Sequence, residues 1–185
     1  MIVEEPIFQI NIVVLGDSKV GKTALLMTYC DRRFPHDYIP IMFDGIAVVR
    51  TYRGDQYHIV IKECSGMKNY KYLRRSLYIG ADFFVICYSV NNPKSLSSAE
   101  TIWAPEVHRQ NPNAPIILVG TKTDLRNKEN GQELVKEDEG YDVAKRIQSR
   151  FYIETSSLHN ENITELFNGV FEMFRPQNRR RCVIF

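Results

Sequence analysis

The stretch Gly16-Asp17-Ser18-Lys19-Val20-Gly21-Lys22-Thr23 decides the fold of this 185-residue chain. An apolar run, residues 10–15, precedes it, and a segment of helical composition, residues 24–30, follows it. Strand, glycine turn and helix in this order are the context of the G-x-x-x-x-G-K-[ST] phosphate loop. Gly16 and Gly21 permit backbone conformations that a side chain would block, so N–H groups and the helix N-terminus can face a polyphosphate. We predict that Lys22 reaches the outer phosphates and that the Thr23 hydroxyl ligates Mg²⁺.

The bulk composition indicates one globular domain followed by a basic tail. A net charge of +2, with 44% hydrophobic and 25% charged residues, is ordinary for a soluble protein. The charge is unevenly placed, because the last dozen residues hold four arginines and no acid. We therefore predict a domain over residues 1–175 and a tail over residues 176–185.

The cysteine pattern and the apolar runs indicate a cytoplasmic protein. The four cysteines have no C-x-x-C spacing, and no signal peptide precedes the first strand-like run. The longest apolar runs are too short to span a bilayer. A reducing cytosol is therefore the expected compartment.

Runs of apolar and β-branched residues alternate with helix-length segments along the chain. The predicted strands cover residues 8–15, 46–52, 57–61, 83–90, 116–119 and 151–153. The predicted helices cover residues 22–30, 68–77, 95–110, 133–150 and 163–174. Residues 51–57 hold an Arg-Gly-Asp turn, so the second and third strands should form a hairpin. The pattern predicts a single doubly wound α/β domain: a mostly parallel six-stranded sheet with one antiparallel hairpin strand, helices on both faces, and ligand bound outside the carboxyl ends of the strands.

Two loops after predicted strands bear on the choice of base. In Thr121-Lys122-Thr123-Asp124, the Asp124 carboxylate can accept hydrogen bonds from both N1–H and the 2-amino group of guanine, a donor pair that adenine lacks. The Lys122 stem can lie along the base and brace the phosphate loop. The second loop, Ser156-Ser157-Leu158, has two interpretations: its backbone N–H groups meet the guanine O6, or it is an ordinary serine-rich turn that caps a helix.

These motifs resemble those of the Ras-like small GTPases, and more narrowly of their Rho branch. The resemblance runs over nearly the whole chain and includes Phe-Pro-His-Asp-Tyr-Ile-Pro at residues 34–40, Trp-Ala-Pro-Glu-Val at residues 103–107 and Pro-Ile-Ile-Leu-Val-Gly-Thr-Lys-Thr-Asp-Leu-Arg at residues 115–126. It implies a G-domain fold that binds GTP or GDP with Mg²⁺. The nucleotide-binding residues that follow from motif and resemblance are Gly16, Asp17, Ser18, Lys19, Val20, Gly21, Lys22, Thr23, Ala24, Phe34, Gly66, Thr121, Lys122, Asp124, Ser156, Ser157 and Leu158.

The resemblance also implies partners. Phe34 would pack edge-on to the guanine, and effector proteins would bind the segment formed by Tyr38, Ile39, Pro40, Ile41, Met42, Phe43 and Asp44. Exchange factors and a prenyl-binding chaperone are further implied partners, and a monomer is expected. The polar stretch of residues 127–140 lies where Rho proteins carry an extra helix, but it is several residues shorter, which places contacts made through that helix in doubt.

Three positions depart from the family pattern where the γ-phosphate is sensed and hydrolysed. Ile41 stands where the family has a threonine that contacts Mg²⁺ and the γ-phosphate. Glu63 replaces an aspartate and, being one methylene longer, can either hold a metal-bound water or crowd the site. Met67 replaces the glutamine that orients the attacking water, and a thioether cannot position water. Gly66 retains the backbone N–H that would meet the γ-phosphate.

These departures favour a protein that binds GTP but hydrolyses it slowly or not at all. The alternative is a pseudo-GTPase without a nucleotide cycle, acting as a membrane-tethered binding module. A third possibility, that a neighbour such as Lys68 or Asn69 replaces the missing glutamine, would restore ordinary hydrolysis. A phosphoryl-transfer kinase is disfavoured, because guanine recognition explains the 121–124 motif better.

The final residues, Cys182-Val183-Ile184-Phe185, form a prenylation signal, and a terminal Phe usually directs a geranylgeranyl group to the cysteine. Arg179, Arg180 and Arg181 would add attraction to anionic lipid. We therefore expect a lipid anchor at Cys182 on the cytoplasmic face of a membrane. The same basic run is short and has no aromatic residues between its arginines, which argues against nucleic-acid binding.

Overall fold

The computed structural model describes residues 7–40, 43–64, 66, 71–127 and 133–174. Within them one six-stranded sheet has the order β2-β3-β1-β4-β5-β6. The strands are β1 (Ile7–Gly16), β2 (Gly45–Tyr52), β3 (Asp55–Glu63), β4 (Phe83–Ser89), β5 (Ile116–Thr121) and β6 (Phe151–Thr155). β2 pairs antiparallel with β3, and the other four pairings are parallel. The predicted mixed sheet with one hairpin strand is confirmed.

The β2–β3 hairpin closes through a two-residue turn. Tyr52 pairs with Asp55, and the two residues between them, Arg53 and Gly54, have φ values of 50° and 88°. Positive φ at both central residues is the geometry of a type I′ turn, whose twist matches that of the flanking strands. The expected turn is present, and the third strand begins at Asp55, earlier than the apolar run alone indicated.

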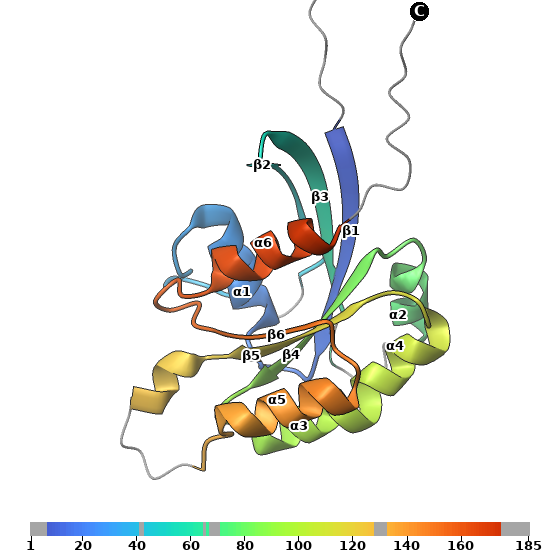
Figure 1. The fold of residues 1–185 in the computed structure, drawn as a ribbon. Coiled ribbons are helices and arrows are strands. Elements are labelled where there is room, and N and C mark those ends of the chain that lie inside the picture. Colours follow the sequence, from blue (N-terminus) through green and yellow to red (C-terminus); the bar gives the residue numbers. More distant parts are fainter. Residues whose placement is uncertain (1–6, 41–42, 65, 67–70, 128–132, 175–185) are drawn as a thin grey trace, which may run out of the picture.

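Helices cover both faces of the sheet (Figure 1). α1 (Lys22–Asp31) and α6 (Ile163–Met173) pack on one face, and α2 (Lys71–Tyr78), α3 (Pro93–Ser98), α4 (Ala104–Gln110) and α5 (Glu137–Arg146) pack on the other. A π-helical turn, η2 (Ala99–Trp103), joins α3 to α4, and a short 3-10 helix, η3 (Thr123–Asn127), follows β5. α6 packs on the sheet because its apolar side chains lie on one face of the helix. Its buried residues recur at helical spacing: Ile163, Leu166, Phe167, Val170 and Phe171.

Two predicted helices differ most from the structure. The segment expected to be helical over residues 133–150 is helical only in α5. The N–H of Val135 donates to the carbonyl of Val90 at 2.8 Å, which keeps the residues before α5 out of the helix. The Glu139 carboxylate then accepts the N–H of Lys136 at 2.7 Å and caps the first turn. The helix expected over residues 95–110 begins at Pro93 and is interrupted by η2.

The predicted second helix, residues 68–77, is observed as α2, and residues 68–70 lie outside the described residues. Among the described residues, we find no helix that is both long and apolar enough to cross a membrane.

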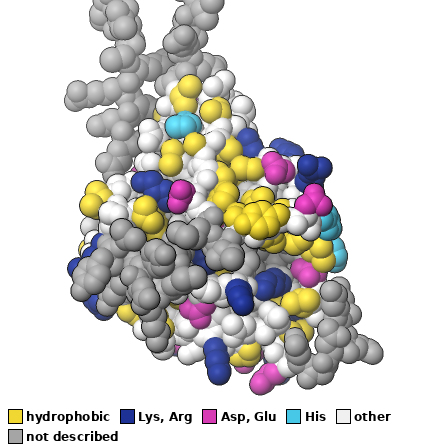
Figure 2. All heavy atoms as spheres, turned by 180° about the vertical axis from the view of Figure 1, so that it is seen from behind, with side chains coloured by type: hydrophobic (Ala, Val, Ile, Leu, Met, Phe, Trp, Pro, Cys, Tyr) yellow, Lys and Arg dark blue, Asp and Glu magenta, His cyan; other side chains and the backbone are white. Residues whose placement is uncertain are grey.

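On the face shown in Figure 2, hydrophobic side chains form an elongated run, with basic and acidic side chains interspersed beside it.

Candidate nucleotide-binding site

The carboxyl ends of β1 and β3–β6 meet at one edge of the sheet, where the phosphate loop leads from β1 into α1. Gly21, the N-cap of α1, has a φ of 101°, and Gly16 has a φ of 141°. Both angles lie in the region that favours glycine. A Cβ on residue 16 would also collide with the carbonyl of Cys87 on β4. The two glycines therefore let the loop turn tightly against the sheet.

The Lys22 ammonium lies inside the phosphate loop. Its Nζ donates to the carbonyl oxygens of Gly16 at 3.1 Å and Asp17 at 2.8 Å, and the residue is only 4% exposed. Burial lowers the pKa of Lys22, while the nearby Glu63 carboxylate acts in the opposite sense. A cation in a loop at a helix N-terminus favours an anion there, which is the chemistry of a phosphate site.

Thr23 and Glu63 form the second polar pair of the loop. The Thr23 hydroxyl lies 2.9 Å from one Glu63 carboxylate oxygen and 2.8 Å from the other. Burial raises the pKa of Glu63, opposed by the hydroxyl and by Lys22. These oxygens are the ligands that Mg²⁺ prefers, usually as one or two protein groups completed by phosphate oxygens. One hydroxyl and one carboxylate supply few of the six ligands of Mg²⁺, so this pair fits the ion as part of a phosphate complex.

Gly66 presses its backbone against the phosphate loop. A Cβ on this residue would lie 2.5 Å from the nitrogen of Ser18 and 2.6 Å from the carbonyl oxygen of Gly16. Contacts this short leave no room for any side chain. Gly66 is therefore in direct contact with the phosphate loop.

The base-recognition residues converge from the ends of β5 and β6. The Ser156 hydroxyl donates to Asp124 Oδ1 at 2.7 Å, and Ser156 is fully buried. Lys122 Nζ donates to the carbonyl of Lys19 at 2.7 Å, which ties the base-recognition segment to the phosphate loop. Burial lowers the pKa of Lys122. A carboxylate held from one side keeps its second oxygen available as an acceptor.

The backbone N–H of Ser156 takes part in the structure of its own loop. This N–H donates to the carbonyl of Glu161 at 3.2 Å, and the two residues form an isolated bridge. Contact between the guanine O6 and the backbone N–H groups of this loop stays a prediction. Ser156 orients Asp124, while Ser157 and Leu158 line the cavity.

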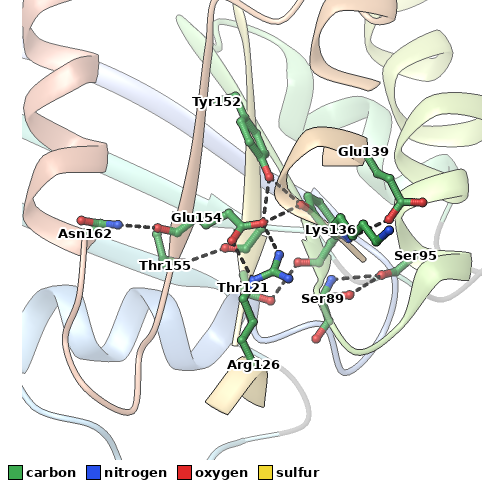
Figure 3. A network of polar contacts seen from close by, with 12 residues as sticks. Ser89, Ser95, Thr121, Arg126, Lys136, Glu139, Tyr152, Glu154, Thr155 and Asn162 are labelled. Atoms are coloured by element: carbon green, nitrogen blue, oxygen red, sulfur yellow. Dashed lines mark hydrogen bonds and ion pairs between the residues drawn. The ribbon is translucent and has the colours of Figure 1, made fainter. Parts of the chain in front are cut away.

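A partly buried polar network holds the predicted base-recognition segment in place (Figure 3). Arg126, in η3, donates to the two oxygens of Glu154 at 3.1 and 2.6 Å. Tyr152 donates to Glu154 at 2.9 Å, and the hydroxyls of Tyr152 and Tyr88 lie 2.8 Å apart. Thr121 completes the anchorage, because its hydroxyl lies within hydrogen-bonding distance of the carbonyls of Val20 and Tyr88. No sequence motif indicated this network.

One cavity of about 480 Å³ joins the phosphate and base residues, a volume typical of small-molecule sites. Most predicted residues line it: Ser18, Lys19, Gly21, Lys22, Thr23, Ala24, Phe34, Glu63, Gly66, Thr121, Lys122, Asp124, Ser157 and Leu158. Leu125 lines it as well and was not predicted. Of the predicted residues that the structure describes, Gly16, Asp17, Val20 and Ser156 are not part of the walls. Val20 is buried in the core instead.

The predicted effector segment borders this cavity and is partly exposed. Ile39 and Pro40 line the cavity, and Tyr38 is 69% exposed. Phe43 packs against the core. The remaining residues singled out from the sequence, Ile41, Met42, Met67, Arg179, Arg180, Arg181 and Cys182, lie outside the described residues.

One contact to the phosphate loop was missed entirely. The indole N–H of Trp103 donates to Asp17 Oδ1 at 2.8 Å across 86 positions of sequence. The Asp17 side chain is thereby turned toward η2. Only the sequence Trp-Ala-Pro-Glu-Val drew attention to this region, and it carried no indication of the partner.

Comparison with known proteins gives consistent matches. The family model described as the Ras family matches residues 11–175. The Rho-related protein racC of Entamoeba histolytica is 38% identical over 186 residues, which cover 95% of this chain and 96% of that protein. The GTP-binding protein RHO4 of Saccharomyces cerevisiae is 37% identical over 163 residues, which cover 88% of this chain but 56% of that longer protein.

Proposed function

The chain belongs to the Rho branch of the Ras family of small GTPases, and from this premise we propose that it is a signalling protein that binds GTP with Mg²⁺ and hydrolyses it slowly or not at all. The domain of residues 1–175 would carry the nucleotide, and the tail of residues 176–185 a lipid anchor. Regulation of the cytoskeleton, trafficking or polarity is the kind of output that the Rho resemblance implies.

The observation that carries guanine binding is the Asp124–Ser156 pair beside the cavity that Lys22 and Thr23 also line. An ionised carboxylate fixed by a buried hydroxyl accepts the N1–H and 2-amino donors of guanine together. Adenine would leave the carboxylate without that donor pair. The same cavity therefore offers a guanine acceptor at one end and a cationic phosphate cradle at the other.

Mg²⁺ would be held by Thr23, with Glu63 close enough to act directly or through water. The ion would supply charge neutralisation to the phosphates. Glu63 keeps the carboxylate that the site requires, and its bond to Thr23 places the hydroxyl at the phosphate end. Lys22 contributes the ammonium group of the cradle.

Slow hydrolysis follows from the residues that orient water and sense the γ-phosphate. Met67 cannot donate a hydrogen bond to water, and Ile41 has no hydroxyl. An activating partner that supplied an arginine would not restore fast hydrolysis, because the site would still lack the glutamine that positions water. We therefore propose a switch that stays in the GTP state for long periods.

The nucleotide content of the purified protein tests guanine binding. Denatured samples prepared with Mg²⁺ should release GTP, detected by chromatography, and Asp124→Ala should release little. Asp138→Ala, at an exposed position of α5, is the matched control and should retain the wild-type content. Bound adenine nucleotide would contradict the proposal and favour a kinase.

Single-turnover hydrolysis tests the slow cycle. Wild-type protein and Met67→Ala should cleave bound GTP at the same low rate, because the thioether contributes nothing to positioning water. A wild-type rate equal to that of ordinary family members, reduced by Met67→Ala, would contradict slow hydrolysis. An empty site would instead support the second candidate, a pseudo-GTPase that acts as a tethered binding module.

Partners and location complete the proposal. Effector proteins would bind residues 38–44, whose Tyr38 side chain is largely exposed beside the cavity. Exchange factors and a prenyl-binding chaperone would act as they do on Rho-like proteins. Prenylation of Cys182, aided by Arg179, Arg180 and Arg181, would hold the protein on the cytoplasmic face of a membrane.

A further inference from the structure

A continuous series of side chains runs from the phosphate loop to helix α2. Trp103 Nε1 donates to Asp17 at 2.8 Å. The Arg74 guanidinium, from α2, lies over the Trp103 ring at 5.0 Å from its centroid. Arg74 also donates to both oxygens of Glu106, at 3.1 and 3.3 Å, and the Tyr78 hydroxyl donates to Glu106 at 2.9 Å. The loop and α2 are thus joined through two residues of the η2–α4 segment.

Burial makes this series rigid. Trp103, Arg74, Glu106 and Tyr78 are 3%, 4%, 7% and 1% exposed. In a buried setting each charge needs its partner, because an unpaired buried charge is strongly unfavourable. The cation–π contact adds attraction when it is desolvated in this way. The side chains therefore have few alternative arrangements while α2 stays in place.

A π-helical turn positions Trp103 for its two contacts. η2 spans Ala99–Trp103, with the Ala104 N–H donating to the carbonyl of Ala99. Such a turn inserts an extra residue into an otherwise α-helical segment, and these turns are frequent at functional sites. It leaves Trp103 buried between the sheet and α2, where it contacts the phosphate loop and Arg74 together.

Asp17 is where this series meets the nucleotide chemistry. Its side chain accepts from Trp103, and its backbone carbonyl accepts from Lys22 Nζ at 2.8 Å. A phosphate that attracted the Lys22 ammonium would change the hydrogen bond between Lys22 and Asp17. Asp17 is also the residue that accepts the indole N–H of Trp103. Gly66, packed on the loop at Ser18, supplies a second contact between the loop and the segment that leads into α2.

We propose that Trp103 is a positioning residue that couples the phosphate loop to helix α2 through Asp17 on one side and Arg74 on the other. The inference rests on the proposed binding of GTP. Occupancy of the loop favours the ordered arrangement of α2, and by linkage the ordering of α2 strengthens nucleotide binding by the same factor. Ile41 and Met67 stand where the family resemblance implies a threonine and a glutamine, so this route gives α2 a separate connection to the phosphates.

The first experiment uses Trp103 as its own probe, because it is the only tryptophan in the sequence. GTP and Mg²⁺ are added to the nucleotide-depleted full chain while binding is measured independently by equilibrium dialysis. Trp103 emission should change in proportion to bound GTP. Asp17→Ala removes the acceptor of the indole N–H and should abolish the change, whereas Asp17→Asn keeps an acceptor oxygen and should restore it. An equal response in wild type and Asp17→Ala would overturn the proposal.

The second experiment measures the coupling at α2. In wild type, GTP should slow amide hydrogen exchange of Lys71–Tyr78 by about tenfold, within the usual range of coupling between sites. Trp103→Phe keeps an aromatic ring for Arg74 but loses the N–H donor. It should lose this slowing and bind GTP about tenfold more weakly, as expected for one hydrogen bond to a charged group. Ile102→Ala, at the neighbouring half-exposed position, is the matched control and should behave as wild type.

The outcomes separate the two proposals. GTP retained in dialysis, with α2 slowed equally in wild type and Trp103→Phe, overturns the coupling alone. Absence of bound GTP in wild type overturns the proposed function and the coupling with it. Loss of the α2 response in Trp103→Phe and Asp17→Ala, with its recovery in Asp17→Asn, establishes the coupling.

Discussion

The Thr23 hydroxyl is shared between both carboxylate oxygens of Glu63, at 2.9 and 2.8 Å. One hydroxyl proton thus faces both oxygens of the Glu63 carboxylate. The bond joins α1 to the end of β3 at the phosphate end of the cavity. The Thr23 hydroxyl, which is expected to bind Mg²⁺, is thus held by a side chain of the protein itself.

Glu63→Asp should make nucleotide retention more dependent on Mg²⁺. The shorter carboxylate withdraws from Thr23, so the protein loses the contact that keeps the hydroxyl in place when the ion is removed. Release of a fluorescent GDP analogue is measured with and without chelator. The chelator should accelerate release at least about threefold more in Glu63→Asp than in wild type, the effect of a modest hydrogen bond. Identical acceleration in both proteins would count against a role for Glu63 at the ion site.

Ser156→Ala should weaken GTP binding by about tenfold or more, because a buried hydrogen bond to a charged carboxylate is lost. Asp124 would remain but would no longer be held in one orientation. Isothermal titration with GTP measures the change. Ser157→Ala removes the neighbouring hydroxyl without touching this pair and should have a much smaller effect, and a reversed order of the two variants would refute the assignment.

Gly140→Ala should destabilise the fold by about 1–2 kcal/mol, although alanine favours helices over glycine by up to about 1 kcal/mol. A Cβ at this position of α5 would collide with the hydroxyls of Tyr152 and Tyr88. Overpacking costs about 1–3 kcal/mol, so the steric cost exceeds the gain in helix propensity. Urea denaturation tests this against Gly169→Ala, in α6, where the nearest atom would be a Phe151 ring carbon at 3.0 Å. The second variant should lose less stability.

Stability should fall as the pH rises above 9. Burial raises the pKa of the Cys64 and Cys87 thiols from 9.0 to about 12. Between these values the unfolded chain loses the protons that the folded protein keeps, so their contribution is complete below about pH 9 and decreases toward pH 12. Each thiol lowers the free energy of unfolding by up to about 1.4 kcal/mol per pH unit.

Urea titrations at about pH 8 and about pH 10 measure this slope. Cys87→Ala should show a shallower decline than wild type, whatever its stability at neutral pH. Unchanged slopes would mean that the Cys87 thiol ionises as readily in the folded protein as in the unfolded chain.

Cys182→Ser should move the protein from the membrane fraction to the soluble fraction of cells. A prenyl chain and a basic segment are each weak anchors and act together. Fractionation of tagged full-length protein tests this, with Cys30→Ser as the matched cysteine control. Persistence of Cys182→Ser on membranes would rule out prenylation as the anchor.

Local sequence signals predicted the fold well. The phosphate loop lies between a strand and a helix as expected, and the six apolar runs became the six strands. Helix bounds failed where a long-range contact overrode local composition, as when the N–H of Val135 donates to the carbonyl of Val90, directly after β4. The π-helical turn had no local signature at all.

The site was predicted through its motifs but not through the contacts that hold those motifs in place. Asp124 and Lys122 could be identified because they belong to one short pattern. The partners of Asp17 and Asp124, Trp103 and Ser156, are distant in sequence and become neighbours only through the order of the strands. A single sequence contains the residues of such pairs but not the pairing.

The order of the sheet also has a consequence for how the chain folds as it is synthesised. β1 is synthesised before both of its neighbours, β3 and β4, to which it is joined by pairs such as Ile7 with Gln56 and Ile12 with Phe83. The pairing of β1 is complete only after both partner strands have been synthesised. Contacts between residues so far apart in the sequence slow folding. Until β4 leaves the ribosome, an apolar strand with an open edge is exposed, and a chaperone that shields it is most useful in that interval.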